Sequence, residues 1–224
     1  MGNFRTTNRV VLSAKSEEAA WIRRLMGWQV SQSDREVSAE IIECCRRGDR
    51  AAFHALYQAY KDKVYSISLY FFHGDDAAAS DATQQVFLKL ITGIGQFKGD
   101  SEFSTWLYRM VVNTCLDSAK AAKRREPLAD AAKLARIAAP QSAEEDRARA
   151  EVAGKVQIAL SSLPPKLRLP VLLRYFHDLS YGEMAEALNC SMGTVASRLH
   201  QGHKLLAEKL AKLRGAATGP STGR

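Results

Sequence analysis

Apolar residues recur at helical spacing along the 224-residue chain, and alternating strand-like runs are absent. Glycines and charges at residues 95–100 predict a loop, and Ser104 is placed to cap the helix that follows it. We therefore predict an all-α protein made of two small helical domains. The helices expected in the first domain are Ala39–Arg47, Arg50–Phe72, Asp76–Ile94 and Ser104–Lys123.

The amino-acid composition of the chain changes between the two domains. Residues 126–150 are rich in Ala and are interrupted by Pro127 and Pro140, which is typical of a flexible linker. We divide the chain into an N-terminal extension of unknown role (1–36), a first domain (37–125), the linker (126–150), a second domain (151–214) and a disordered tail (215–224). In the extension, Trp21, Leu25 and Trp28 share one face of a short helix, which fits internal packing, a partner or a membrane surface.

The second domain carries the sharpest motif. Leu163-Pro164-Pro165 favours the start of a helix, and Ser180 and Glu183 have the spacing of a capping box around the next one, Tyr181–Leu188. Asn189 suits a left-handed turn before the following helix. Two short helices joined by a tight turn predict a helix-turn-helix.

The last helix of this motif, capped by Ser191, has two distinct faces. Val195, Leu199 and Leu206 form its apolar side. The polar residues on and beside the opposite face suit the major groove of DNA, and a merely solvated face is the alternative. They are Thr194, Ser197, Arg198, His200, Gln201 and Lys204.

In the first domain, the helix from Asp76 has a second stripe beside its core-facing one. The stripe mixes two exposed apolar residues with amides and a carboxylate, which suits a protein interface. Coverage by the protein's own chain is the alternative. Its members are Asp81, Gln84, Gln85, Leu88 and Ile91.

The loop and the helix that follow are basic and aromatic. Phe97, next to Lys98, and Phe103 either stack on unpaired bases or belong to the core. The helix then gathers polar and positive residues that predict a polyanion as partner, with a solvated basic face as the alternative. These are Arg109, Asn113, Lys120, Lys123, Arg124 and Arg125.

The net charge of +8 lies in two places. Residues 109–125 and 198–214 each carry +4, so the rest of the chain sums to zero. No apolar run approaches the roughly 18 residues that a membrane-spanning helix needs, so we expect no integral membrane protein. The four cysteines form no C-x-x-C pair, which favours reduced thiols in a cytoplasmic protein over a zinc site or a disulfide scaffold.

Catalytic and metal sites have weak candidates. Asp75 and Asp76 with His73 could form the site of a DNA-processing enzyme, although capping of a helix is the simpler interpretation. His200 and His203 could bind a metal at i and i+3. We expect no catalytic residue, no metal, no cofactor and no small-molecule substrate.

Five blocks in register resemble the alternative sigma factors of the extracytoplasmic-function (ECF) group. The first block is Arg47-Gly48-Asp49 with Ala52-Phe53 and Leu56-Tyr57, and the second is Asp81, Gln84 and Phe87-Leu88-Lys89. The third runs from Phe97 and Gly99 through Phe103 to Arg109, and then includes Asn113 and Asp117. The fourth runs from Leu163-Pro164 through Leu179 to Ala185, and the fifth from Ser191 to Leu199.

The resemblance implies two helical domains joined by a flexible linker, and a protein that directs core RNA polymerase to a promoter. Asp81, Gln84, Gln85, Leu88 and Ile91 would dock on the polymerase clamp. The loop around Lys98–Phe103 and the basic helix would recognise and melt the minus-10 element, and the recognition helix would read the minus-35 element. The linker would thread into the polymerase near the RNA exit path, and an anti-sigma factor is an expected partner.

Several positions depart from the family pattern. Ala196 stands where a basic residue is frequent, Gln201 and His203 stand where Arg is frequent, and Gly202 replaces a common Ala. The recognition face is therefore less basic than is usual, and a promoter sequence does not transfer. The rival function is a helix-turn-helix repressor or activator that works without polymerase, with residues 37–125 as a sensing or dimer domain.

Overall fold

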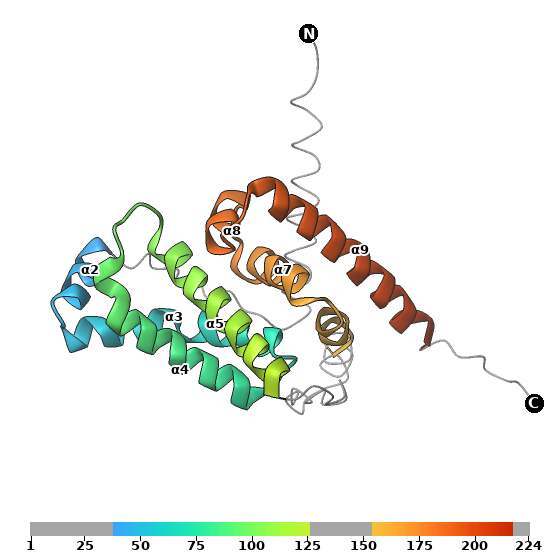
Figure 1. Cartoon of the computed structure of the whole chain (residues 1–224), viewed down its shortest axis with the longest axis horizontal. Coiled ribbons are helices and arrows are strands. Elements are labelled where there is room, and N and C mark those ends of the chain that lie inside the picture. Colours follow the sequence, from blue (N-terminus) through green and yellow to red (C-terminus); the bar gives the residue numbers. More distant parts are fainter. Residues whose placement is uncertain (1–37, 126–153, 217–224) are drawn as a thin grey trace, which may run out of the picture.

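The computed structural model describes residues 38–125 and 154–216, and within them every regular element is a helix (Figure 1). This confirms the all-α prediction. The expected N-terminal extension, the linker and residues 217–224 of the expected tail lie outside the described residues. The helices are α2 Ala39–Arg46, α3 Arg50–Phe71, α4 Asp76–Gly93, the 3₁₀ turn η1 Ile94–Gln96, α5 Phe103–Arg125, residues 154–161, α7 Pro165–His177, α8 Tyr181–Ala187 and α9 Met192–Ala216.

The N-terminal unit, α2 to α5, is a bundle in which α4 packs against both α3 and α5. Its centre is built from apolar residues that recur at three- and four-residue spacing, so each helix contributes one stripe. The fully buried members include Leu56, Val64, Val86, Leu90, Leu107 and Val111.

The starts of these helices follow local capping chemistry. The Asp49 carboxylate accepts from the Ala51 amide at 2.8 Å, and the Asp75 carboxylate accepts from the Ala78 amide at 3.0 Å. The prediction for Ser104 was wrong, because α5 already begins at Phe103 and Ser104 lies inside its first turn. The end predicted at Ile94 is also corrected: α4 stops at Gly93 and a 3₁₀ turn follows.

The C-terminal unit contains the predicted helix-turn-helix. In α8, the Ser180 hydroxyl accepts from the Glu183 amide at 3.2 Å, and the Glu183 carboxylate accepts from the Ser180 amide at 2.7 Å, which completes the capping box. Asn189 has the expected left-handed backbone, with φ of 48°. α9 runs to Ala216, so the first two residues of the expected tail are helical.

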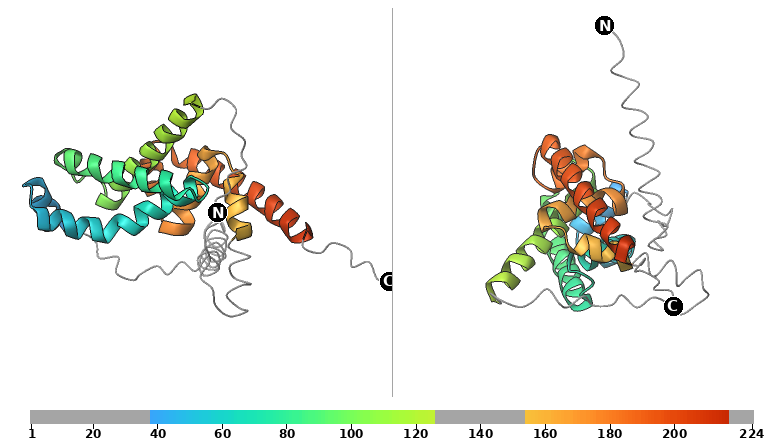
Figure 2. Two further views of the ribbon diagram at one scale, coloured as in Figure 1. Left: turned by 90° about the horizontal axis from the view of Figure 1, so that it is seen from below. Right: turned by 90° about the vertical axis from the view of Figure 1, so that its right-hand side faces the viewer.

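The two units lie against each other, with α8 packed on α5 and α7 packed on α3 (Figures 1 and 2). Arg109 donates to the Asn189 side chain at 3.0 Å, and the Tyr108 hydroxyl lies 3.3 Å from Nδ1 of His177. Arg168 of α7 donates to the carbonyl of Phe71. The two predicted helical domains are thus both present in the described residues, and they contact each other.

Candidate functional surfaces

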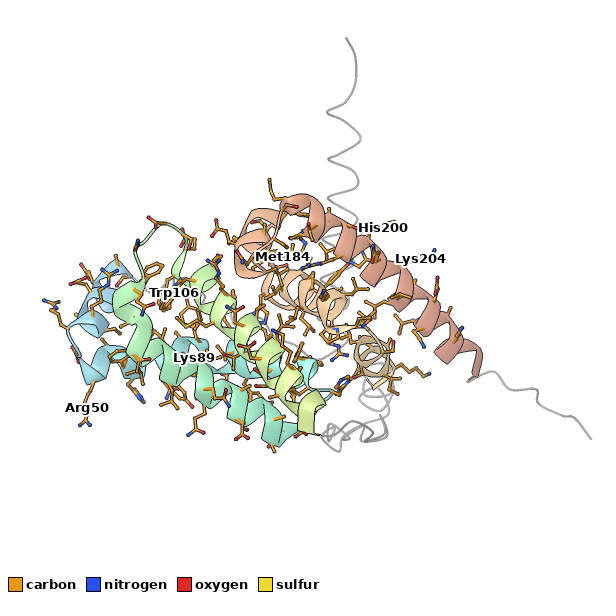
Figure 3. The ribbon with its side chains drawn as sticks, in the orientation of Figure 1. Arg50, Lys89, Trp106, Met184, His200 and Lys204 are labelled. Atoms are coloured by element: carbon orange, nitrogen blue, oxygen red, sulfur yellow. The ribbon has the colours of Figure 1, made fainter. Side chains whose placement is uncertain are left out.

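The outer face of α9 presents four of the six polar residues predicted for its groove-reading side. Ser197, His200, Gln201 and Lys204 are exposed, and Figure 3 shows His200 and Lys204 on the outer side of the helix. Val195 and Leu199 are buried beneath them and hold the helix to the bundle. The result is a preformed polar face on a rigid support, as base reading in a major groove requires.

The other two predicted residues of α9 are half-buried and engaged locally. The Thr194 hydroxyl lies 2.9 Å from that of Ser191, whose oxygen also accepts from the Thr194 amide at 3.2 Å. Arg198 lies with Nη1 3.6 Å from the sulfur of Cys190 in the preceding turn. Thr194 and Arg198 therefore contact the turn that precedes α9 and also lie beside its polar face.

The unusual residues Gly202 and His203 face the core. A Cβ on Gly202 would lie 3.0 Å from Cγ2 of Val171 and 3.5 Å from the Leu167 carbonyl, so only glycine lets α9 approach α7 this closely. Nε2 of His203 lies 2.8 Å from the Tyr175 hydroxyl, with the two rings edge to face. These departures from the family pattern therefore lie at the contact between α9 and α7, away from the exposed face of α9.

The α5 helix carries the predicted basic residues along its length. Arg109, Asn113 and Lys120 are exposed, and Lys120 pairs with Asp117 at 3.3 Å. Residues 123–125 lie in the final turns of the helix. One stripe of α5 thus carries polar and positive groups outward, and its first member, Arg109, already has a partner in the C-terminal unit.

The loop before α5 corrects one prediction. Lys98 is exposed as expected, but Phe103 is only 5% exposed and lies among the rings of Tyr60, Phe97 and Trp106, at centroid distances of 5.4 to 5.7 Å. Phe103 therefore offers no free face to a base. Its ring is large and apolar, so burial in this cluster outweighs exposure on the loop.

The mixed stripe of α4 is open to solvent. Leu88 is 57% exposed and Ile91 is 52% exposed, and Asp81, Gln84 and Gln85 are exposed around them. On the core side of the same helix, Val86 and Leu90 are fully buried. No described residue covers the stripe, which favours an external partner over the protein's own chain.

The candidate catalytic and metal residues have structural partners. Asp75 caps α4, and the Asp76 carboxylate accepts from the Tyr65 hydroxyl, which raises the pKa of Tyr65 to about 12. His203 is bound to Tyr175. Within the described ranges no group of three His, Cys, Asp or Glu residues could hold a metal ion, and no helix is long and apolar enough to cross a membrane.

Sequence reasoning missed Arg168. Arg168 is only 3% exposed, and its guanidinium donates to the carbonyls of Leu160, Ser161 and Leu163 at 2.6 to 3.0 Å. It also donates to the carbonyl of Phe71 and lies 3.2 Å from Nε2 of His73 in the N-terminal unit. Burial lowers its pKa to about 10, so it remains charged at neutral pH. Its apolar neighbours at i+3 and i+4, Val171 and Leu172, were the available signal of a buried position.

Comparison with known proteins places both units in one family. Residues 56–125 match the family model described as Sigma-70 region 2, and residues 154–206 match Sigma-70, region 4. The chain is 33% identical over 189 residues to the RNA polymerase sigma-H factor of Pseudomonas aeruginosa, covering 80% of this chain and 96% of that protein. The chain is an ECF sigma factor.

A second relative agrees with this assignment. The ECF RNA polymerase sigma-E factor of Escherichia coli (strain K12) is 33% identical over 186 residues, covering 77% of this chain and 94% of that protein. As a member of this family, the protein binds core RNA polymerase and directs promoter-specific initiation.

The fold resembles that of two proteins that were solved with bound partner proteins. One is RpoE in complex with the anti-sigma factor NepR from Bartonella quintana, with a TM-score of 0.59 and 18% identity over 71% of this chain and 96% of that one. The other is CnrH in complex with the cytosolic domain of CnrY, with a TM-score of 0.58 and 18% identity over 79% and 98%. At this identity the likeness concerns the fold alone.

Proposed function

We propose that this sigma factor divides its work among three surfaces. The α4 stripe docks on the clamp of core polymerase, α5 and the Lys98 loop bind and melt the minus-10 element, and the outer face of α9 reads the minus-35 element. The observation that carries the proposal is the exposure of two polar, basic helix faces on two units, beside an uncovered stripe with Leu88 and Ile91.

Each surface suits its role by its chemistry. Leu88 and Ile91 offer apolar area for a protein contact, and the amides around them can pair with polar groups at the rim. Arg109, Asn113 and Lys120 can follow the phosphates of a strand. When α9 lies in a major groove, the exposed polar side chains of Ser197, His200 and Gln201 can contact base edges.

The proposed activity requires no catalysis by the sigma factor itself. Melting of the minus-10 element needs only that the separated strand binds more tightly than the duplex, at a cost of a few kcal/mol for each unstacked step. We assign no catalytic residue, cofactor, metal or small-molecule substrate. We place the protein in the cytoplasm, where its polymerase and DNA lie.

An anti-sigma factor is the third partner in this proposal. Two proteins of the same fold have been solved with partner proteins, and one of these partners, NepR, is described as an anti-sigma factor. The exposed α4 stripe is the surface such a partner would gain most by covering, because the same residues would dock on polymerase.

The test is transcription by a reconstituted holoenzyme. Purified core polymerase is incubated with the protein and a genomic fragment library, and transcript starts are mapped. We expect a defined set of starts that core polymerase alone does not use. Tight binding to palindromic duplexes without polymerase, with no new starts, would instead support the repressor or activator alternative.

A further inference from the structure

Met192 is an apolar side chain at the start of the helix that we assign to duplex DNA. It is the first residue of α9 and is 60% exposed, more than any other large apolar side chain in the described ranges. Among the residues that the structure describes, it belongs neither to the buried core nor to the side chains packed against that core. The fold therefore gives no internal reason for a methionine at this position.

The start of α9 is fixed by local contacts, so Met192 has a defined place. The Ser191 hydroxyl accepts from the Thr194 amide at 3.2 Å, and the Ser191 carbonyl accepts from the Val195 amide at 3.0 Å. The Cα–Cβ bonds of a helix tilt toward its N-terminus, so the side chain of the first residue extends beyond the end of the helix. Met192 thus projects from the N-terminal end of α9, and buried Val195 holds that end to the bundle.

The exposed surface of the first two turns of α9 is small and uncharged. Its members are Met192, Gly193, Ala196 and Ser197. The cation nearest in sequence, Arg198, is half-buried, with Nη1 3.6 Å from the sulfur of Cys190. The exposed cation Lys204 lies about 18 Å further along the helix axis than Met192, at 1.5 Å per residue. The outer side of α9 therefore has an apolar end and a basic end.

An apolar end of this kind matches one chemical group in the major groove. The C5-methyl group of thymine is the one methyl group that unmodified base pairs present there. Recognition helices place their N-terminal residues against base edges, and the unbranched side chain of methionine adapts its shape to such a contact. A protein partner fits this end less well, because one large apolar side chain is a small anchor for an interface that buries about 800 Å² on each side.

We propose that Met192 is a specificity-determining residue of minus-35 recognition, and that it contacts the C5-methyl group of a thymine. This rests on the proposed function of α9. Met192 precedes Ser197 by about 7.5 Å along the helix axis, so the two side chains address different base pairs. The methyl contact selects an A·T pair at one or two neighbouring positions at one end of the element. The polar residues Ser197 and Gln201 read the positions that follow.

Uracil substitution tests the contact, because deoxyuridine pairs with adenine as thymidine does but lacks the C5-methyl group. The reconstituted holoenzyme is given a promoter found by start mapping, in which each thymine of the minus-35 region, on either strand, is replaced singly by uracil. Affinity is measured by competition with the unmodified, fluorescently labelled promoter fragment. We expect about a fourfold loss at one or two neighbouring thymines, which is the factor that burial of one methyl group contributes.

Variants of Met192 connect the methyl effect to this side chain. Met192→Ala should bind the unmodified promoter about fourfold more weakly and should no longer distinguish thymine from uracil at the positions found with the wild-type chain. Met192→Leu keeps an apolar group and should retain a methyl effect of at least about twofold. Ile158→Ala is the matched control, since it truncates another exposed apolar side chain of the same unit and should keep the whole methyl effect.

Three results would overturn the role of Met192 and leave the proposed function intact. They are equal affinity of the wild-type holoenzyme for every uracil form, a minus-35 region without A·T pairs, and a methyl effect in Met192→Ala as large as that of the wild-type chain. Absence of upstream protection by the wild-type holoenzyme in nuclease footprinting would instead overturn the assignment of α9 to minus-35 DNA. The two failures are therefore distinguishable on one promoter.

Discussion

The two helices that we assign to DNA differ in how freely they present their side chains. On α9, Ser197, His200, Gln201 and Lys204 are exposed above a buried apolar face. On α5, Arg109 is bonded to the C-terminal unit, and Lys120 is paired with Asp117. The duplex-reading surface is thus preformed, whereas the strand-melting surface must exchange contacts first.

This difference fits the two kinds of DNA. Reading an intact duplex in the major groove requires a fixed helix face, which the contact of Gly202 and His203 with α7 supplies. Holding a separated strand is useful only after polymerase has been bound. We therefore expect the Arg109–Asn189 and Lys120–Asp117 contacts to be exchanged for DNA contacts when the strand is held.

The largest expected effect comes from Leu88→Asp, which removes the step on which both DNA surfaces depend. A carboxylate within the docking stripe should weaken core polymerase binding by at least about thirtyfold, because buried apolar anchors contribute about 2 kcal/mol or more. Ile158→Asp is the matched control, since Ile158 is 41% exposed outside the stripe. Equal losses in the two variants, measured by biolayer interferometry, would remove the special role of the stripe.

The second-largest expected effect is on promoter opening, and it distinguishes the role of α5 from that of α9. Lys120→Ala combined with Arg124→Ala should reduce promoter opening about tenfold, because two charges that follow the phosphates of the melted strand are lost. Arg47→Ala with Arg50→Ala removes the same charge from exposed positions of the N-terminal unit and should leave opening nearly unchanged. Opening is followed by fluorescence of a base analogue in the minus-10 element.

Gly202→Ala should disturb the preformed surface alone. The added Cβ meets buried Val171 at 3.0 Å, so overpacking of about 1–3 kcal/mol exceeds the gain of about 1 kcal/mol in helix propensity. Thermal unfolding should show a net loss of up to about 2 kcal/mol, with weaker minus-35 binding. A double-mutant cycle with Val171→Ala should give a cost below the sum, and strict additivity would contradict the contact.

The smallest expected effect is a gain in affinity for duplex DNA. Gln201→Arg restores a cation on the exposed face of α9, and one more phosphate contact should improve duplex affinity a few-fold. The logarithmic salt dependence should steepen by about 0.9. His203→Arg is the contrasting variant, because His203 faces Tyr175 and should lose stability without steepening the slope.

Sequence reasoning succeeded where structure is local. The capping box of Ser180 and Glu183 and the left-handed Asn189 depend on neighbours within three residues, and the helix-turn-helix formed as predicted. It could not decide between two environments for Phe103, because an aromatic residue at the end of a loop fits either stacking or burial until the ring cluster is known.

The contacts between the units were beyond sequence reasoning. Arg168 and Phe71 are 97 residues apart, and nothing in the periodicity of α7 or α3 identifies the other as its partner. The inward direction of Gly202 and His203 likewise depends on how closely α9 approaches α7. The sequence indicated which residues are unusual, and packing alone showed what they do.

The most direct test of two separable DNA surfaces combines nuclease footprinting with permanganate probing of a holoenzyme on a promoter found by start mapping. We expect the Lys120→Ala, Arg124→Ala holoenzyme to protect the minus-35 region while thymines of the minus-10 region stay unreactive. We expect Ser197→Ala with Lys204→Ala to lose the upstream protection itself. Loss of upstream protection in the Lys120→Ala, Arg124→Ala holoenzyme would contradict the account. Full opening with intact upstream protection in both variant holoenzymes would also contradict it.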